Sequence, residues 1–205
     1  MWWRELEALQ GACVLAERGL ELCVDETAII ADSAILDPLR GPIVIGARTR
    51  ICPGAHIAGP VEIGSDCLIG NNSMVRGPTR IGDGTRVGFS TEIKAAIIAP
   101  GVTIGPQCFV ADSKVETGAY LGAQVRTSNH RLDKKNVTVM IDGAPVDTGM
   151  EKLGCLIGAH AALGIQVIVL PGREVAPGSL FAPRVTVERN LPPGRYRPAQ
   201  QLEEF

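Results

Sequence analysis

Aromatic residues are scarce in this chain. Phe, Trp and Tyr make up only 4% of its 205 residues, although the hydrophobic share as a whole is 45%. Because aromatic rings are the largest core-filling side chains, the core must be assembled from aliphatic and small residues. The length is compatible with one domain, or with an elongated one that spreads its core along a single axis.

Long apolar runs and an excess of one charge are missing as well. Twenty basic and 22 acidic residues leave a net charge of −2, which offers no basic patch for nucleic acid or for an acidic membrane surface. No stretch reaches the about 18 apolar residues of a membrane span, and the charged start MWWRELEALQ does not resemble a signal peptide. We therefore expect a cytoplasmic protein that acts on small molecules, with no nucleic-acid or membrane partner.

Cysteine motifs and histidine clusters are also lacking. The six cysteines are scattered and form no C-x-x-C pair, so the sequence indicates neither a disulfide framework nor a cysteine zinc site. The three histidines, His56, His130 and His160, are spread along the chain. We expect no structural metal.

What the sequence does contain is an aliphatic residue at every sixth position. The longest unbroken run is Ile45, Ile51, Ile57, Ile63, Ile69, Val75, Ile81, Val87 and Ile93. The series passes through two five-residue steps to Leu121, resumes from Ile157 to Val187, and can be traced back to Val24. A fixed period of this kind is the signature of a solenoid of stacked coils.

A small or β-branched residue stands two positions before almost every one of these aliphatic residues, as Thr49 does before Ile51. Residues two apart share one face of a strand, so we expect both to point inward and the intervening Arg50 to point outward. Three cysteines occupy the same small inward positions: Cys67, Cys108 and Cys155. We interpret them as buried core residues rather than as reactive thiols.

The pattern resembles that of hexapeptide-repeat proteins, in which roughly three hexads close one triangular coil. That resemblance implies an all-β fold, a left-handed parallel β-helix, whose hand runs against the usual crossover rule and does not follow from the spacing. We expect residues 1–22 to form a helix and linker capping the N-terminal end, with Trp2, Trp3 and Leu6 on one face. Residues 23–190 should form the β-helix, and the tail 191–205 should leave it at Pro192-Pro193 and cover the other end or a neighbouring chain.

One long insertion, residues 126–152, interrupts the repeat. Within it, VTVMI and APVDT flank Asp142-Gly143, a strong signal for a two-residue β-hairpin. Loops of this length inside a regular fold are usually functional. We expect the chemistry of the protein to lie here.

Residues 60–190 resemble the C-terminal acetyltransferase domain of bifunctional sugar-phosphate nucleotidyltransferases, which acetylate glucosamine 1-phosphate and then make UDP-N-acetylglucosamine. The stretch VDTGMEKLGCLIGAHAALGI carries the resemblance most distinctively, and MWWRELEALQ is similar to the linker helix of that family. The pyrophosphorylase domain has no counterpart in the sequence. The resemblance implies transfer of an acyl group, acetyl from acetyl-CoA, to an amino or hydroxyl group of a sugar or sugar phosphate, by a homotrimer.

Carried over residue by residue, the resemblance also implies binding positions. Arg76 and Lys94 fall where the family holds the sugar phosphate with a basic pair, and Asn129 and Tyr120 are further candidates for substrate binding. The implied positions along acetyl-CoA are Ala123, Gly158, Ala159, His160, Ala182 and Arg184. Arginines 189, 195 and 197 are further candidates for the CoA phosphates.

The sequence departs from the family at three active-site positions. Pro106 stands where the family has its catalytic histidine, Phe109 where it has a tyrosine, and Tyr120 where it has the asparagine that orients the acetyl group. Proline cannot accept a proton, so the candidate general base is His130 in TSNHRLD, a string that resembles the N-H-R-x-D loop of hexapeptide xenobiotic acetyltransferases. A histidine suits proton transfer near neutral pH, whereas an exposed loop histidine without function is the simpler alternative.

Two functions therefore remain open. The first is CoA-dependent acyl transfer with His130 as the base. The second is a non-catalytic β-helix, a scaffold or sugar-nucleotide-binding relative that has lost its catalytic histidine. A three-histidine zinc site like that of hexapeptide carbonic anhydrases is not expected within one chain, because His56 should lie about four coils, roughly 19 Å, from the loop.

Overall fold

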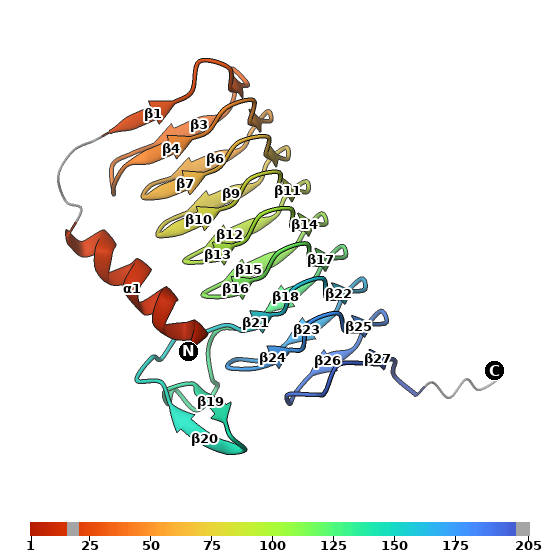
Figure 1. The fold of residues 1–205 in the computed structure, drawn as a ribbon. Helices are drawn as coiled ribbons and strands as arrows, with labels where there is room; N and C mark the ends of the chain where they lie inside the picture. Colours follow the sequence, from red (N-terminus) through yellow and green to blue (C-terminus); the bar gives the residue numbers. More distant parts are fainter. Residues whose placement is uncertain (16–20, 200–205) are drawn as a thin grey trace.

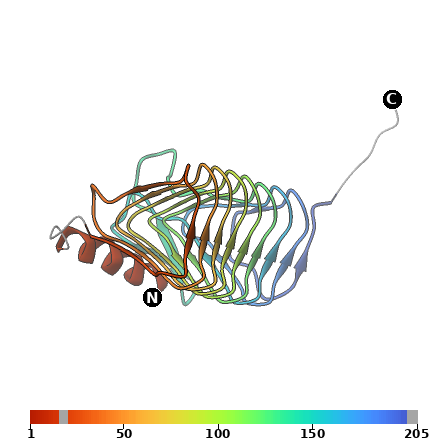
Figure 2. The same cartoon turned by 90° about the horizontal axis from the view of Figure 1, so that it is seen from above.

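The chain forms a solenoid of three parallel sheets. The computed structural model describes residues 1–15 and 21–199. Successive short strands turn from one sheet to the next, so that strands one coil apart in the sequence lie side by side. Figures 1 and 2 show the coils stacked along one axis. The predicted left-handed parallel β-helix is confirmed.

We name the three sheets A, B and C. Sheet A contains β1 (Leu22–Val24), β4 (Ile43–Ile45), β7 (Val61–Ile63), β10 (Thr79–Ile81), β13 (Ile97–Ile98), β16 (Lys114–Val115), β21 (Leu156–Ile157) and β24 (Glu174–Val175). Sheet B contains β2 (Ile29–Ile30), β5 (Arg50–Ile51), β8 (Leu68–Ile69), β11 (Arg86–Val87), β14 (Thr103–Ile104), β17 (Tyr120–Leu121), β22 (Ala162–Leu163), β25 (Leu180–Phe181) and β27 (Arg195–Tyr196). Sheet C contains β3 (Ile35–Asp37), β6 (His56–Ala58), β9 (Met74–Arg76), β12 (Glu92–Lys94), β15 (Phe109–Ala111), β18 (Arg126–Thr127), β23 (Ile168–Val169) and β26 (Thr186–Val187).

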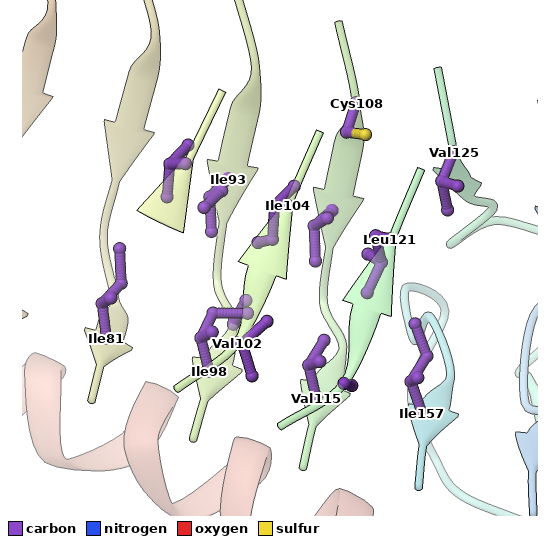
Figure 3. Packing of buried hydrophobic residues seen from close by; sticks show 14 of the residues in the cluster. Ile81, Ile93, Ile98, Val102, Ile104, Cys108, Val115, Leu121, Val125 and Ile157 are labelled. Atoms are coloured by element: carbon purple, nitrogen blue, oxygen red, sulfur yellow. The ribbon is translucent and has the colours of Figure 1, made fainter. Parts of the chain in front are cut away.

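The repeating aliphatic residues form the core as the six-residue period predicts. Ile51 lies in register with Ile69 one coil away, and both are buried. Thr49, two positions before Ile51, is also buried, whereas Arg50 between them is exposed. Figure 3 shows aliphatic side chains from successive coils packed in the interior. Each contributes roughly 1.5–3 kcal/mol of hydrophobic free energy before conformational entropy is subtracted, so a column of them replaces the missing aromatic core.

The inward cysteines are buried components of this core. Cys67, Cys108 and Cys155 all belong to the main hydrophobic cluster. Burial raises the pKa of the Cys155 thiol to about 12 and also raises the pKa values of the Cys67 and Cys108 thiols. Because the thiolate is the reactive form, these three residues serve packing.

The insertion contains the predicted hairpin. β19 (Thr138–Ile141) and β20 (Ala144–Asp147) pair antiparallel, and both turn residues, Asp142 and Gly143, have positive φ angles of 49° and 80°. This is the backbone required by a two-residue turn with the twist of a hairpin. Arg126 and Thr127 still belong to the coil as β18, so the insertion begins after Thr127, at the corner between sheets C and A.

The prediction that the N-terminal segment caps the N-terminal end of the solenoid is wrong. It forms helix α1 (Trp2–Leu15), which lies along the side of the β-helix next to sheet A (Figures 1 and 2). Its apolar face packs against the insertion, in a cluster of buried residues that we call the strap cluster: Trp2, Trp3, Leu6, Val137, Val139 and Leu153. Two apolar residues of sheet A that point outward, Ile97 and Leu156, also pack against the strap cluster. The helix packs over these apolar residues because removing their surface from water is favourable.

Polar contacts fix the position of α1. The indole Nε1 of Trp2 donates to Glu174 Oε1 at 2.9 Å, and Lys114 Nζ lies 2.8 Å from Glu5 Oε1. α1 has 14 residues, and no helix in the described part of the chain has the length and apolar character needed to cross a membrane.

The C-terminal tail also differs from the prediction, because the chain does not leave the solenoid at Pro192-Pro193. Leu191 bridges Val175, and β27 beyond the prolines pairs in parallel with β25. The ring of Tyr196 stacks on Phe181 with a centroid distance of 5.0 Å. The tail therefore continues sheet B up to β27 and covers the last coil, because Phe181 and Val175 would otherwise lie at an open end.

Candidate functional site

The predicted basic pair lies on sheet C, close to the insertion. Arg76 in β9 and Lys94 in β12 are in register on neighbouring strands. Each is paired with a carboxylate: Arg76 Nη2 lies 2.7 Å from Glu92 Oε1, and Lys94 Nζ lies 3.4 Å from Asp112 Oδ2. The sequence thus located two neighbouring cations correctly but did not reveal that both carry a counter-ion.

Asp112 is the residue that sequence reasoning missed. It lies at the corner between sheets C and A with a positive φ of 48° and is only 4% exposed. Its Oδ2 accepts a hydrogen bond of 2.6 Å from Asn129 Nδ2, and the same oxygen faces Lys94. Its carbonyl accepts from the backbone N–H of Gly154, where the chain returns from the insertion. A charged residue inside the five-residue step between Val110 and Val115 was the available signal.

The structure therefore brings three of the predicted residues together. Lys94 and Asn129 meet at Asp112, and Arg76 lies one strand away. The buried carboxylate holds both in place through a hydrogen bond from Asn129 and an ion pair with Lys94, because leaving it unpaired in a low-dielectric site would be costly.

His130 directly follows this cluster. Its backbone forms an antiparallel bridge with Lys152, so the two ends of the insertion are joined there. Its side chain is exposed. The next residue, Arg131, forms a bidentate pair with Asp133, with Nη2 to Oδ2 at 2.6 Å, and this holds the pKa of the Asp133 carboxyl well below its usual range. The imidazole of His130 makes no hydrogen bond within residues 1–15 and 21–199 and is accessible to a bound molecule.

A hollow of about 590 Å³ opens on sheet C, on the side of the corner between sheets B and C. We call it the C-face hollow, and its lining residues are Ser90, Glu92, Gln107, Cys108, Phe109 and Arg126. Glu92, Phe109 and Arg126 lie in register on three neighbouring strands. Pro106, at the position of the family's histidine, immediately precedes the lining residue Gln107 at the corner between sheets B and C.

Tyr120 lies on a different face. Its side chain is exposed on sheet B, in a row in which Tyr120, Ala162, Leu180 and Arg195 are in register. The small Ala162 between two large neighbours leaves a gap, and a hollow of about 490 Å³ forms there. We call it the B-face hollow. Its other lining residues include Ala182, Tyr196 and Arg197.

The residues predicted along acetyl-CoA occupy two separate corners. Ala123, Ala182 and Arg184 follow sheet B strands at the corner between sheets B and C, where Arg184 Nε donates to Gln166 Oε1 at 3.2 Å. Gly158, Ala159 and His160 lie at the corner between sheets A and B. His160 has a positive φ of 57°, and its imidazole packs over Gly118 of the preceding coil.

These two corners are on opposite edges of sheet B. One chain therefore does not bring the predicted donor residues into a single pocket, nor does it bring Tyr120 to Arg76 and Lys94. Among the described residues, no group of three or more His, Cys, Asp or Glu could hold a metal ion.

Comparison with known proteins gives a consistent picture of the family. The family description "Bacterial transferase hexapeptide (six repeats)" matches residues 42–77 and 60–95. The chain is 52% identical over 203 residues to a protein of Escherichia coli K12 named as a putative uncharacterized acetyltransferase, YaiX; the match covers 98% of this chain and 88% of the relative.

More distant relatives cover less of the chain. A bifunctional sugar-1-phosphate nucleotidylyltransferase/acetyltransferase of Sulfurisphaera tokodaii is 33% identical over 110 residues, which are 54% of this chain and 27% of that protein. Among solved structures, a hexapeptide transferase family protein from Anaplasma phagocytophilum aligns over 90% of this chain and 79% of that one, with 20% identity and a TM-score of 0.49.

Proposed function

This chain belongs to the hexapeptide-repeat transferase family, and we propose that it transfers an acetyl group from acetyl-CoA to an amino or hydroxyl group of a sugar or sugar phosphate. The acetyltransferase name of the E. coli relative supports the reaction class. The sugar-1-phosphate relative, which aligns with about half of the chain, supports a sugar acceptor.

The observation that carries the proposal is the C-face hollow next to the cluster around Asp112. A hollow of this volume suits a monosaccharide derivative. The aromatic ring of Phe109 lies on the strand between Glu92 and Arg126, so the lining offers an apolar surface for a sugar ring and charged groups for its polar substituents. Lys94, two residues from the lining residue Glu92 on the same strand, is held together with Asn129 by one buried carboxylate. The acceptor would bind here.

The donor would lie across the neighbouring corner. The B-face hollow offers an apolar slot over Ala162 and two arginines, Arg195 and Arg197, at its edge. Arginine recognises phosphate groups with paired hydrogen bonds, so these residues suit the phosphates of CoA. Ala123 lies at the corner that separates this hollow from the C-face hollow and would border the path of the thioester.

The chemistry requires one proton acceptor. The acceptor nitrogen or oxygen attacks the thioester carbonyl carbon, the C–S bond breaks, and the thiolate of CoA takes up a proton. The proton of the attacking group must go to a base in the site. We assign this role to His130, because Pro106 cannot perform it and His130 adjoins Asn129 at the margin of the acceptor cluster.

The proposal is tested by a transfer assay. Acetyl-CoA should release its thiol when the protein is incubated with amino sugars and their phosphates, and the acetylated product should be found by mass spectrometry. Acetyl-CoA should also raise the melting temperature, because a ligand that binds only the folded state stabilises it. The alternative of a non-catalytic scaffold has its own support, namely Pro106, and it predicts no thiol release with any acceptor and no stabilisation by CoA.

We also propose that the working unit is a homotrimer. The residues predicted along acetyl-CoA lie at opposite edges of sheet B in one chain, so a single donor site requires residues from a neighbouring chain. Cyclic symmetry would then create three equivalent sites. Sedimentation in analytical ultracentrifugation should give three times the chain mass of 21.7 kDa. A stable monomer at micromolar concentration would contradict both the trimer and a shared site.

A further inference from the structure

The cations of sheet C differ in whether a carboxylate neutralises them. Arg76 is paired with Glu92, and Lys94 is paired with Asp112. Arg126 is different. Within residues 1–15 and 21–199 no carboxylate lies within ion-pair distance of its guanidinium, although the side chain is half-buried and lines the C-face hollow. The uncompensated positive charge of this hollow is therefore on Arg126.

Backbone groups hold this guanidinium in place. Its Nη1 donates to the carbonyl of Gln107 and, at 3.3 Å, to the carbonyl of Val125. Carbonyl oxygens fix the orientation of a cation without neutralising it. The N–H groups on Nε and Nη2 make no hydrogen bond to the described residues, so they can form the two parallel bonds with which arginine binds phosphate or carboxylate.

The register defines how a ligand would lie. Glu92, Phe109 and Arg126 occupy neighbouring strands in register, and strands are spaced by about 4.8 Å. The Cα atoms of Glu92 and Arg126 are thus separated by roughly 10 Å, with Phe109 on the strand between them. A ligand that fits this row has an apolar or ring-shaped middle, an anionic end and a hydrogen-bond-donating end.

We propose that Arg126 binds the anionic group of the acceptor, so that the substrate is an acidic sugar of the phosphate type, with its ring over Phe109. The inference rests on the proposed function and narrows its substrate class. It assigns the anion to Arg126 rather than to Arg76 and Lys94, because binding an anion at either of those residues would have to displace a carboxylate that is already in place.

Other outward arginines without a carboxylate partner provide the comparison. Arg86 on sheet B is exposed, lies outside the hollows described above and forms no ion pair within the described part of the chain. Loss of Arg86 removes the same charge from the surface as loss of Arg126 but leaves the C-face hollow intact. The variant Arg86→Gln is therefore a matched control for a general loss of positive charge.

The test uses calorimetric binding of glucosamine 1-phosphate and of glucosamine, which differ by the phosphate. For the wild type, glucosamine 1-phosphate should bind more tightly than glucosamine. Arg126→Gln should raise its Kd by about 10-fold or more, the loss expected for a charge-assisted pair, and Arg126→Lys should give a smaller loss. Arg86→Gln should change the Kd by less than about 2-fold, within the effect of distant surface charges, and Arg76→Gln should raise the Kd less than Arg126→Gln does.

A second arm separates the acceptor from the donor, since CoA also carries phosphates. The Kd of CoA should be the same for the wild type and for Arg126→Gln. If Arg126→Gln raises the Kd of CoA and leaves the Kd of glucosamine 1-phosphate unchanged, the anion that Arg126 binds belongs to the donor and the inference is wrong. It is also wrong if the wild type does not distinguish the two sugars, or if Arg76→Gln has the larger effect. Neither binding measurement requires acetyl transfer. A protein that shows both expected binding results but transfers no acetyl group would therefore contradict the proposed reaction and not the anion site.

Discussion

Replacing His130 with alanine is expected to lower the turnover of acetyl transfer by about 10²–10⁴-fold, the usual contribution of a general base. The Kd of CoA and the melting temperature should stay nearly unchanged, because the imidazole is exposed and makes no hydrogen bond to the described residues. Steady-state kinetics with acetyl-CoA and a saturating acceptor would measure the loss as a fall in kcat.

Leu132 offers a control in the same loop. It is fully exposed, at 101%, so Leu132→Ala perturbs the loop surface without removing a titratable group, and its kcat should match that of the wild type. Equal losses in the two variants would indicate a disturbed loop rather than a lost base. Transfer that survives His130→Ala would remove His130 from the mechanism and leave the proton acceptor to be found among the other residues of the site.

Replacing Trp3 with alanine is expected to cost about 3–5 kcal/mol in the free energy that holds α1 and the hairpin against the solenoid, as large-to-small changes at fully buried aromatic positions do. Trp3 is 2% exposed and packs in the strap cluster with Leu6, Val137 and Val139. Because each coil of a solenoid contacts mainly its neighbours, we expect local opening rather than global unfolding. Hydrogen exchange should increase in α1 and in residues 137–147, with the central coils unchanged.

Trp3→Phe is the matched variant. The indole Nε1 of Trp3 is buried and has no hydrogen-bond partner in the described structure, so removing it sacrifices no bond and relieves the cost of an unpaired donor. Phenylalanine retains most of the apolar surface, and the expected loss is below about 1.5 kcal/mol. Similar exchange rates for Trp3→Ala and the wild type would show that α1 does not hold the hairpin in place.

The two predictions concern connected parts of the molecule. The strap cluster includes Leu153, which lies next to Lys152 and whose backbone N–H donates to the carbonyl of Asn129. Through this contact, α1 supports the segment that carries Asn129 and His130. If Trp3→Ala opens the hairpin as expected, the transfer rate should therefore fall as well, whereas Trp3→Phe should leave it nearly intact.

The sequence by itself determined the solenoid. Residues such as Ile51, Ile69 and Val87 recur at six-residue multiples, and each strand pairs with the strand one coil away. That pairing needs only the length of the coil, which is three hexads in the family that the sequence resembles, and the alternation within a strand determines which residues face the core. The turn at Asp142-Gly143 is equally local, because two residues with positive φ define it.

Only the tertiary structure decided where α1 lies and how the charges of sheet C are paired. Trp2, Trp3 and Leu6 show that one face of the helix is buried, but their partners at Val137 and Leu153 are more than 100 residues away in the sequence. Apolar burial is non-directional, so an amphipathic pattern cannot state which surface it covers.

The candidate site shows the same limit. The sequence and the family resemblance predicted a site at Arg76, Lys94 and Asn129, and the structure places Lys94 and Asn129 at Asp112 with Arg76 one strand away. Which cations remain unpaired depends on a left-handed corner at Asp112 and on the register that sets Arg126 beside Phe109. Coulomb interactions fall with distance and depend on burial, and both quantities are set only when the coils have stacked.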